Sequence, residues 1–495
     1  MVDASAIRPL APSAPFCGHK SGGNLGRKET QKAQIRSYCG GSDLLNFRLS
    51  GFLAFWLSGH PVSPIVPFRL IPYLLCLALL SGGAAALSAA EPAILAARRI
   101  AREALAAHGA KDEKAFLAKM QQAVALRPDY PRLLVNLAEA QVANDQLAEA
   151  VVTLGRLADL ETHSPVDQDA ELAALRDRDD FKAVVKRIDA NLLPVGEHEI
   201  AFTLPGMSGL IEGIAWREKT KEFFFGDVHT RAVWVRAPDG KVRRFSEPAD
   251  TLFGLFGLAV DEDHGALWAA TSMVPGVSGY TPAQDGAAGL AEFDLDSGKL
   301  RRVIKLAVDG QARVLGHLAL APDGSVYLTD SIGGALWRLA PGGKELDRFM
   351  ENDEFVSLQD LAVTPDGRNL FLTDHANGLL CVDLAKRTVR HLDSPPNTTL
   401  VGLDGLALAP GGDLLAVQNG LHPLRVLRLT VDDARSSVTD VKVLESAHPS
   451  MAEPALGCIA DGYFVFIGNA GWSRFENDDP KPTAPRPVPI FRTKL

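Results

Sequence analysis

Two acidic residues that lie far apart in the sequence each open an apolar, strand-like run: Glu212 begins EGIAWR and Asp404 begins DGLALA. Two carboxylates that meet in a fold can hold a hard cation, because such ions prefer oxygen ligands. Without a cation, one of the two has a raised pKa, which gives a base that works near neutral pH. The alternative is that both acids accept hydrogen bonds from backbone amides and only order the chain around them.

Four histidines are candidates for substrate contact or proton transfer, because imidazole titrates near neutral pH. They are His229, His317, His375 and His422. For each of them, the alternative is a loop histidine with no chemical role. The sequence contains no G-x-S-x-G, H-E-x-x-H, phosphate-loop or dinucleotide motif, so a serine hydrolase of that type, a zinc protease of that type and a nucleotide-dependent enzyme are disfavoured.

The elements that carry the two acids belong to a repeat. Its clearest copies are GHLALAPDGSVYLTDSIGGALWRL (316–339), QDLAVTPDGRNLFLTDHANGLLCVDL (359–384) and DGLALAPGGDLLAVQNGLHPLRVLRL (404–429). Weaker copies begin at 212, 256 and 456, and the spacing of most copies is near 44 residues. Short apolar runs separated by Gly, Asp and Pro turns are typical of strands, and this period is typical of a four-stranded propeller blade. The sequence therefore predicts a mainly β fold, a six-bladed β-propeller over residues 196–495.

The propeller geometry brings the candidate residues together. In an antiparallel blade, the start of the inner strand lies on the same face as the loop between the second and third strands. Glu212, Gly316, Gln359 and Asp404 share the first position of their repeats, so we expect them at the mouth of the central channel. Two long loops, 272–288 and 469–487, are expected to act as lids over this mouth. We also expect the strand HEIAFTL (198–204) to close the ring beside the C-terminal strand VPIFRTKL.

Residues 198–495 resemble the family of six-bladed propellers that includes senescence marker protein, gluconolactonase and luciferin-regenerating enzyme. The resemblance depends on Glu212-Gly213, on the repeated GLALAPDG, VYLTD and LWRL segments, and on Asp404-Gly405. It implies a divalent cation, Ca2+ or Zn2+, at the channel mouth. Glu212 and Asp404 match the acidic ligands of the family, and Gln359 stands at a position where the family has Asn. Gly316 stands at the other such position and offers no side chain.

Two functions are compatible with these residues. The resemblance implies a metal-dependent lactonase, a hydrolase of a small lactone or cyclic ester, in which Glu212, Gln359 and Asp404 hold the metal and Asp404 is also the catalytic base. In that reading the four histidines contact the substrate. The alternative is a non-catalytic propeller that binds a ligand or a protein and whose metal site has eroded, as Gln359 and Gly316 suggest.

Residues 91–195 have apolar residues at helical spacing and are rich in Ala, Leu, Glu, Lys and Arg. The segment from Met120 to Leu160 resembles tetratricopeptide repeats, with about two copies and a weaker third. The sequence predicts a small α-helical domain of this kind before the propeller. Its role is either a groove for a peptide or protein partner or a structural spacer.

The N-terminal part of the sequence reads as a targeting region. Residues 66–90 have a basic residue, an apolar core and a small-residue end, the order of a signal peptide, and residues 1–65 in front of them suggest a mis-assigned start. A periplasmic or secreted protein without a stable membrane span is expected. Residues 91–495 carry 43 Lys and Arg against 57 Asp and Glu, so nucleic acid is a poor partner. The family resemblance implies a small molecule as the ligand.

Overall fold

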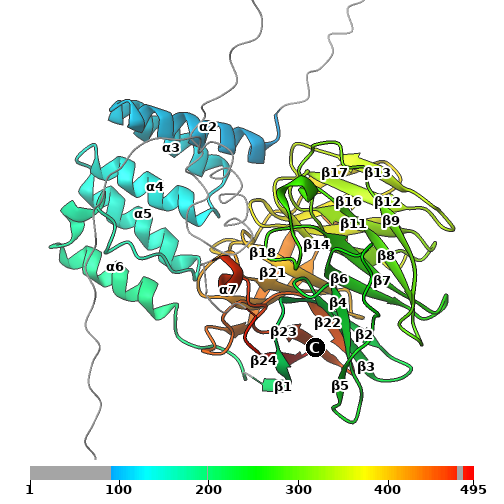
Figure 1. Ribbon diagram of the computed structural model, residues 1–495. Coiled ribbons are helices and arrows are strands. Elements are labelled where there is room, and N and C mark those ends of the chain that lie inside the picture. The colour runs from blue at the N-terminus through cyan, green and yellow to red at the C-terminus, as the bar shows by residue number, and fades with distance from the viewer. Residues whose placement is uncertain (1–90, 198, 477–482) are drawn as a thin grey trace, which may run out of the picture. The chain divides into compact units, whose positions relative to one another are not determined.

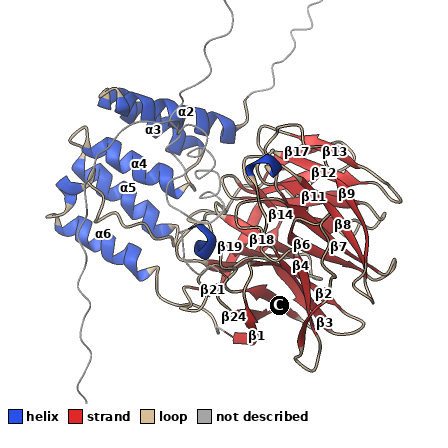
Figure 2. Ribbon diagram, in the orientation of Figure 1, coloured by secondary structure: helices blue, strands red, loops and turns tan. Residues whose placement is uncertain are grey.

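Six four-stranded antiparallel sheets succeed one another in the computed structural model, which describes residues 91–197, 199–476 and 483–495 (Figure 1). The innermost strands of the sheets contact one another in a closed order, β2 (Ile211–Arg217), β6 (Gly254–Asp261), β10 (Leu315–Leu320), β14 (Leu358–Val363), β18 (Leu403–Leu408), β22 (Gly457–Ala460) and back to β2. Figure 2 shows these sheets as the strand-rich part of the molecule. The predicted six-bladed propeller is therefore confirmed.

The outer three strands of each blade follow the inner strand along the chain. In blades one to three they are β3 (Glu222–Asp227), β4 (Ala232–Arg236) and β5 (Val242–Arg244); β7 (Ala266–Ser272), β8 (Ala288–Asp294) and β9 (Leu300–Lys305); β11 (Val326–Asp330), β12 (Ala335–Leu339) and β13 (Leu346–Glu351). In blades four and five they are β15 (Asn369–Asp374), β16 (Gly378–Asp383) and β17 (Thr388–His391); β19 (Leu414–Gln418), β20 (Arg425–Val431) and β21 (Val438–Ser446).

The last blade joins the two ends of the propeller. Its strands are β22, β23 (Tyr463–Ile467), β24 (Arg486–Lys494) and, outermost, β1 (Glu199–Met207). Strand β1 pairs antiparallel with β24, with Ile200 opposite Phe491. The predicted closure by the segment at 198–204 is confirmed for the residues described.

Turn residues and strand irregularities give each blade its shape. In the turns that follow β10 and β14, Gly324 and Gly367 have φ values of +84° and +66°, which favour glycine. Register shifts interrupt the pairing at the start of the inner strand in the first five blades. Such irregularities redirect side chains and occur where pairing ends. Here they span the first position of the repeat, which is occupied by Glu212, Gly316, Gln359 and Asp404.

A side-chain pair with a spacing of seven residues recurs across the second and third strands. The acceptor ends the second strand and the donor lies on the third strand, so the bond holds the intervening loop. The bonds join Asp227 to Trp234 (3.2 Å), Asp330 to Trp337 (3.5 Å) and, with other residue types, Gln418 to Arg425 (2.8 Å). These acceptors are buried, so Asp227, Asp330 and Gln418 at the ends of their second strands are structural.

Aliphatic and aromatic side chains fill the spaces between neighbouring blades. One cluster joins blades one and two around Phe224 and Phe293, and others join the later blades around Phe371 and Phe464. Alternate residues along each strand supply these contacts, because successive side chains of a strand point to opposite faces. The packed blades give the channel residues a rigid support.

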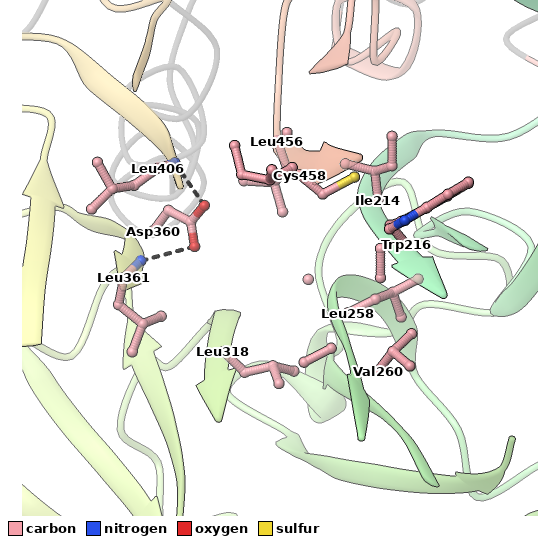
Figure 3. Close-up of a pocket in the computed structure, with 15 residues that line it drawn as sticks. Ile214, Trp216, Leu258, Val260, Leu318, Asp360, Leu361, Leu406, Leu456 and Cys458 are labelled. Atoms are coloured by element: carbon pink, nitrogen blue, oxygen red, sulfur yellow. Dashed lines mark hydrogen bonds between the residues drawn. The ribbon is translucent and has the colours of Figure 1, made fainter. Parts of the chain in front are cut away.

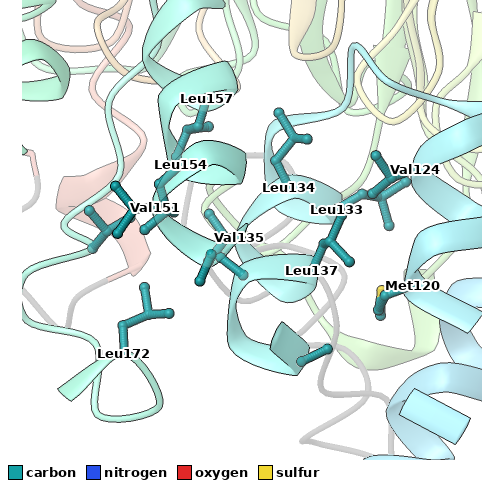
Figure 4. Packing of buried hydrophobic residues seen from close by; sticks show 14 of the residues in the cluster. Met120, Val124, Leu133, Leu134, Val135, Leu137, Val151, Leu154, Leu157 and Leu172 are labelled. Carbon is teal, nitrogen blue, oxygen red and sulfur yellow. The ribbon is translucent and has the colours of Figure 1, made fainter. Parts of the chain in front are cut away.

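Residues 93–190 form helices α2 (Ala93–Gly109), α3 (Glu113–Leu126), α4 (Pro131–Val142), α5 (Leu147–Asp159) and α6 (Asp179–Ala190), and each packs against the next. Their shared core surrounds Met120, Leu134 and Leu154 (Figure 4). A helical region before the propeller was predicted; its assignment to tetratricopeptide repeats stays a prediction. The signal peptide (66–90) and the segment 1–65 lie outside the described residues. No helix among the described residues has the length and apolarity needed to cross a membrane.

Candidate functional site

The acids that the sequence singled out sit at the starts of two inner strands, Glu212 on β2 and Asp404 on β18. Each is followed by a glycine because the next blade approaches closely. A Cβ on Gly213 would lie 1.9 Å from the carbonyl oxygen of Phe256, and a Cβ on Gly405 would lie 2.9 Å from a carbonyl oxygen of the following blade. The Glu-Gly and Asp-Gly pairs therefore reflect tight packing of inner strands around the channel.

Hydroxyl groups on second strands fix the inner strand of the next blade. Thr373 on β15 donates to the carbonyl oxygen of Asp404 (2.5 Å), and Thr329 on β11 donates to that of Gln359 (2.6 Å). Ser272 on β7 makes the same connection to Leu315 (3.0 Å). Because these bonds join neighbouring blades, the backbone of Asp404 is held by blade four as well as by β19 of its own blade.

Glu212 is buried and interacts electrostatically with Asp404. Its side chain is hydrogen-bonded by the indole N–H of Trp472, at 2.7 Å from Oε2. Burial raises the pKa of Glu212 well above its usual range, and the negative charge of Asp404 raises it further, while the bond from Trp472 partly offsets both. Glu212 is therefore disposed to hold a proton at neutral pH.

Asp404 is the end of a hydrogen-bonded chain of three side chains. The carboxamide of Asn419 donates to Oδ2 of Asp404 and also to the carbonyl oxygen of Pro454 (2.8 Å). The Oδ1 atom of Asn419 lies 2.8 Å from Nε2 of His375. The other carboxylate oxygen of Asp404, Oδ1, is buried and has no hydrogen-bond partner in the described part of the chain. Buried polar atoms rarely lack a hydrogen-bond partner, and this atom is free to accept a hydrogen bond from a ligand or a water molecule.

Glu212, Asp404 and the side chains bonded to them form a group that we call the inner-strand cluster. His317 and Asp360 extend this cluster into blades three and four. The ring of His317 is 1% exposed, and neither nitrogen has a hydrogen-bond partner among residues 91–197, 199–476 and 483–495. Its Nδ1 lies 3.7 Å from Oδ1 of Asp360. Burial lowers the pKa of His317 to about 4, although Asp404 acts in the opposite direction, so the ring is neutral at pH 7. A neutral imidazole can both donate and accept a proton.

The residues present do not fit the divalent cation that the family resemblance implies. The carboxamide of Gln359 donates to the carbonyl oxygen and hydroxyl of Ser357 (3.2 and 3.1 Å), within its own loop. Gly316 has no side chain to offer. One carboxylate oxygen of Glu212 and one of Asp404 already accept an N–H group. No group of three or more His, Cys, Asp or Glu side chains in the described ranges is arranged to hold a metal ion.

The remaining candidate histidines have different surroundings. Nδ1 of His229 lies 2.5 Å from the carbonyl oxygen of Gly276 in the loop 272–288, and its ring packs on Phe475 in the other long loop, with centroids 4.7 Å apart. His229 therefore fastens both loops that were expected to act as lids. His375 reaches Asp404 through Asn419, whereas the exposed ring of His422 makes no hydrogen bond to these side chains in the part of the chain that the structure describes.

Three residues of the cluster were not among the predicted site residues: Asp360, Asn419 and Trp472. A signal for Asp360 exists in the repeat. Four blades have glycine at the second position of the repeat, before an aliphatic residue in three of them and before Cys458 in blade six, whereas blades three and four have His317 and Asp360 there. A side chain at a position that is otherwise glycine, next to the channel, marks both residues. Trp472 carries no such signal, because its partner Glu212 is 260 residues away.

The charge state of Asp360 gives a test of this arrangement. Burial raises the pKa of Asp360 from 3.8 to about 8, so the folded state holds a proton that the unfolded state has released. The stability that this proton provides is lost as pH rises through 8. The free energy of unfolding of the wild type should therefore fall as the pH rises from 7 to 8. We expect this fall to be smaller in Asp360→Asn, by about 1 kcal/mol per pH unit.

Urea titrations at several pH values measure this slope. His317 does not disturb the comparison, because an unfolded histidine is largely neutral in this window and the folded one is neutral throughout. An unchanged slope in Asp360→Asn would show that Asp360 is ionised in the native protein.

Comparisons with known proteins concern the fold. No family model and no curated protein matches the chain. Among solved structures it is similar to a luciferin-regenerating enzyme (13% identity, 61% of this chain and 96% of the other, TM-score 0.43). It is also similar to a gluconolactonase from Xanthomonas campestris (17%, 60% and 94%, 0.40) and to a virginiamycin B lyase from Staphylococcus aureus (14%, 54% and 80%, 0.38). At these identities and TM-scores, the similarities do not establish an activity.

Proposed function

We propose that the protein hydrolyses a small lactone or cyclic ester at the inner-strand cluster, with Asp404 as general base. The observation that carries the proposal is the asymmetric environment of the Asp404 carboxylate. One oxygen is held by Asn419 and the other is buried without a protein partner. A base needs such a free, oriented oxygen within reach of the proton that it removes.

Two further groups suit the same reaction. Glu212 is disposed to be a neutral acid and can donate a hydrogen bond to a developing oxyanion, as Asp404 cannot. The neutral ring of His317 has free nitrogen atoms with which to orient a water molecule or the ester. Acid, base and polar contact thus come from blades one, five and three.

The proposed reaction has a simple balance. Asp404 removes a proton from a water molecule while the oxygen of that water attacks the carbonyl carbon of the ester. Glu212 stabilises the negative charge that forms on the carbonyl oxygen. The bond between the acyl carbon and the ring oxygen then breaks, and the ring oxygen receives the proton held by Asp404. One water is consumed and one hydroxy acid is formed, so the enzyme returns to its initial state. No step passes through a metal ion.

A second function, a non-catalytic ligand-binding propeller, is favoured by a different observation. Glu212 and Asp404 are 4% and 5% exposed, and each already accepts a side-chain hydrogen bond, from Trp472 of blade six and from Asn419 of blade five respectively. Such closure suits retention of a ligand as well as turnover. The helical region would then serve as a second docking surface, for a peptide or protein.

A panel of lactones of different ring size, assayed with EDTA and with added Ca2+ or Zn2+, separates these functions. We expect hydrolysis of at least one small lactone, with a rate that EDTA does not change by more than about twofold. Activity that EDTA abolishes and Ca2+ or Zn2+ restores would contradict the metal-free proposal. Saturable lactone binding without turnover would favour the binding protein.

We place this activity outside the cytoplasm, in the periplasm or secreted. The support is the signal-like order of residues 66–90 together with the acidic composition of residues 91–495. Sequencing the N-terminus of the protein purified from its native host tests the placement. A mature chain that begins upstream of residue 66 would contradict it.

A further inference from the structure

The central channel contains a cavity that the proposed hydrolysis does not use. Its volume is about 230 Å³, and all six inner strands contribute to its wall. It extends from Asp360 to Trp216, Val260 and Ile459, which lie near the ends of β2, β6 and β22. Glu212 and Asp404 lie at the opposite ends of their strands. The cavity is therefore the half of the channel that adjoins the inner-strand turns.

The lining combines aliphatic side chains with one carboxyl group. Leu258, Leu318, Leu361 and Leu406 surround the space, and Figure 3 shows Asp360 among them. Asp360 is the single acidic or basic residue among those that line this cavity. An aliphatic wall with one carboxyl at its inner end suits a ligand with a short apolar body and a cationic head.

Asp360 has capacity for such a partner. Its two oxygens accept the backbone N–H groups of Leu361 and Leu406, each at 2.8 Å, which fixes the carboxyl group between blades four and five. In the described ranges no Lys or Arg forms an ion pair with it, and His317 is the nearest basic group, at 3.7 Å. Burial raises the pKa of Asp360 to about 8, so an ammonium group that binds near neutral pH displaces the proton of this carboxyl group. Each oxygen of the resulting carboxylate has more than one acceptor site and can accept a further donor.

The backbone of the channel wall adds acceptors. Each inner strand is the edge of its sheet, so it has only one hydrogen-bonded neighbour. An edge strand presents unpaired carbonyl oxygens and N–H groups on its open side. A primary ammonium group has three donors and no acceptor, which matches one carboxylate and nearby carbonyl groups better than an alcohol or a quaternary ammonium does.

We propose that this half of the channel is a second binding site, specific for a small primary ammonium compound with an aliphatic chain. A cavity of about 150 Å³ accommodates benzene, so 230 Å³ has room for a chain of about four to six carbons. Its ligand is held by Asp360 and the channel wall and not by Asp404, so binding at this site does not require lactone turnover.

Calorimetric titration at pH 9, where Asp360 is ionised, with n-butylammonium chloride tests the site directly, with n-butanol and butyltrimethylammonium chloride as probes of the same chain. Sodium chloride keeps the ionic strength constant. We expect n-butylammonium to bind with a Kd on the order of 1 mM, as suits a ligand of five heavy atoms. Both other probes should bind at least about tenfold more weakly. Equal binding of butanol and butylammonium would overturn the proposal.

Two variants locate the binding. Asp360→Asn removes the charge, and we expect it to weaken butylammonium binding by about ten- to a hundredfold. Val260→Phe narrows the outer end of the cavity without touching Asp360, and it should also abolish binding, whereas Val260→Ala should not. If Asp360→Asn is unstable, the Val260 pair decides. If Val260→Phe binds butylammonium as tightly as the wild type does, the ammonium group binds elsewhere and the proposal is wrong. Because no step uses turnover, a protein that fails to hydrolyse lactones can still pass this test.

Discussion

Asp404→Asn is expected to lower kcat for lactone hydrolysis by about a thousandfold, within the range typical of a lost general base. The variant keeps the shape of the side chain and an oxygen that can accept the Asn419 carboxamide, so KM should change by less than about threefold. The loss arises because a carboxamide cannot take the proton that the free Oδ1 atom of Asp404 would accept. Steady-state kinetics of the two proteins on the best lactone of the panel measure both constants.

Asp323→Asn is a matched control for this substitution. Asp323 lies in the exposed turn that follows β10 in blade three, where its carboxylate accepts the backbone N–H (2.9 Å) and the hydroxyl (3.1 Å) of Ser325. We expect its kcat to equal that of the wild type. If Asp404→Asn keeps at least a fifth of the wild-type kcat and an unchanged melting temperature, Asp404 is not the base.

A second variant separates orientation from proton transfer. Asn419 holds Oδ2 of Asp404 and contacts His375, so Asn419→Ala should leave the base present but less well oriented. A positioning residue of this kind should lower kcat without removing the dependence of the rate on an ionised base. The pH profile of kcat should therefore persist in Asn419→Ala and disappear in Asp404→Asn.

The propeller could be predicted from the sequence because its information is local and repeated. Each repeat of about 44 residues contains the strand, turn and glycine pattern of one blade, so the copies at 316, 359 and 404 support the same blade assignment. The ring closure was also predictable, since β1 and β24 carry strand patterns at the two ends of the repeats. Packing between blades then follows from strand alternation.

The site could be predicted only in part, because hydrogen-bond partners are not local. The first position of the repeat indicated Glu212 and Asp404, and the structure places both at the starts of inner strands with an electrostatic interaction between them. The same rule indicated Gln359, yet its longer side chain turns back to Ser357. One extra methylene group is enough for this, since it lets the carboxamide reach a closer backbone acceptor.

The second position of the repeat carried information that the first position obscured. His317 and Asp360 stand where four blades have glycine, and they approach within 3.7 Å. Alignment of the repeats identifies the residues that the copies have in common. The polar side chains of this channel include two residues, His317 and Asp360, at which the copies differ. The environment of Asp227, Asp330 and Asp374 shows the converse, because these repeated acids are buried acceptors for backbone and indole N–H groups.

Asp374→Ala is expected to destabilise the protein by about 3–5 kcal/mol, the largest effect on stability that we predict. The carboxylate accepts four backbone N–H groups: those of Val356 (2.8 Å), Ser357, Ala376 and Asn377 (2.9 Å each). Asp374 is fully buried, so a methyl group in its place leaves these donors without a partner and without water. Each buried orphan donor costs about 1–3 kcal/mol, partly relieved by local adjustment.

The effect of Asp374→Ala extends to the channel because the donors flank an inner strand. Val356 and Ser357 directly precede β14, which carries Gln359 and Asp360, so loss of their hydrogen bonds to Asp374 frees the segment that positions Asp360.

Urea titration of Asp374→Ala, Asp374→Asn and Asp366→Ala measures the contribution of Asp374 to the free energy of unfolding. Asp374→Asn keeps one acceptor atom and should fall between the wild type and the alanine variant. Asp366 lies in the exposed turn of the same blade, where it bonds Thr364 and Arg368, so Asp366→Ala should cost less than about 1 kcal/mol. Similar free energies of unfolding for Asp374→Ala and Asp366→Ala would contradict the structural role of Asp374, because only one of the two carboxylates is buried.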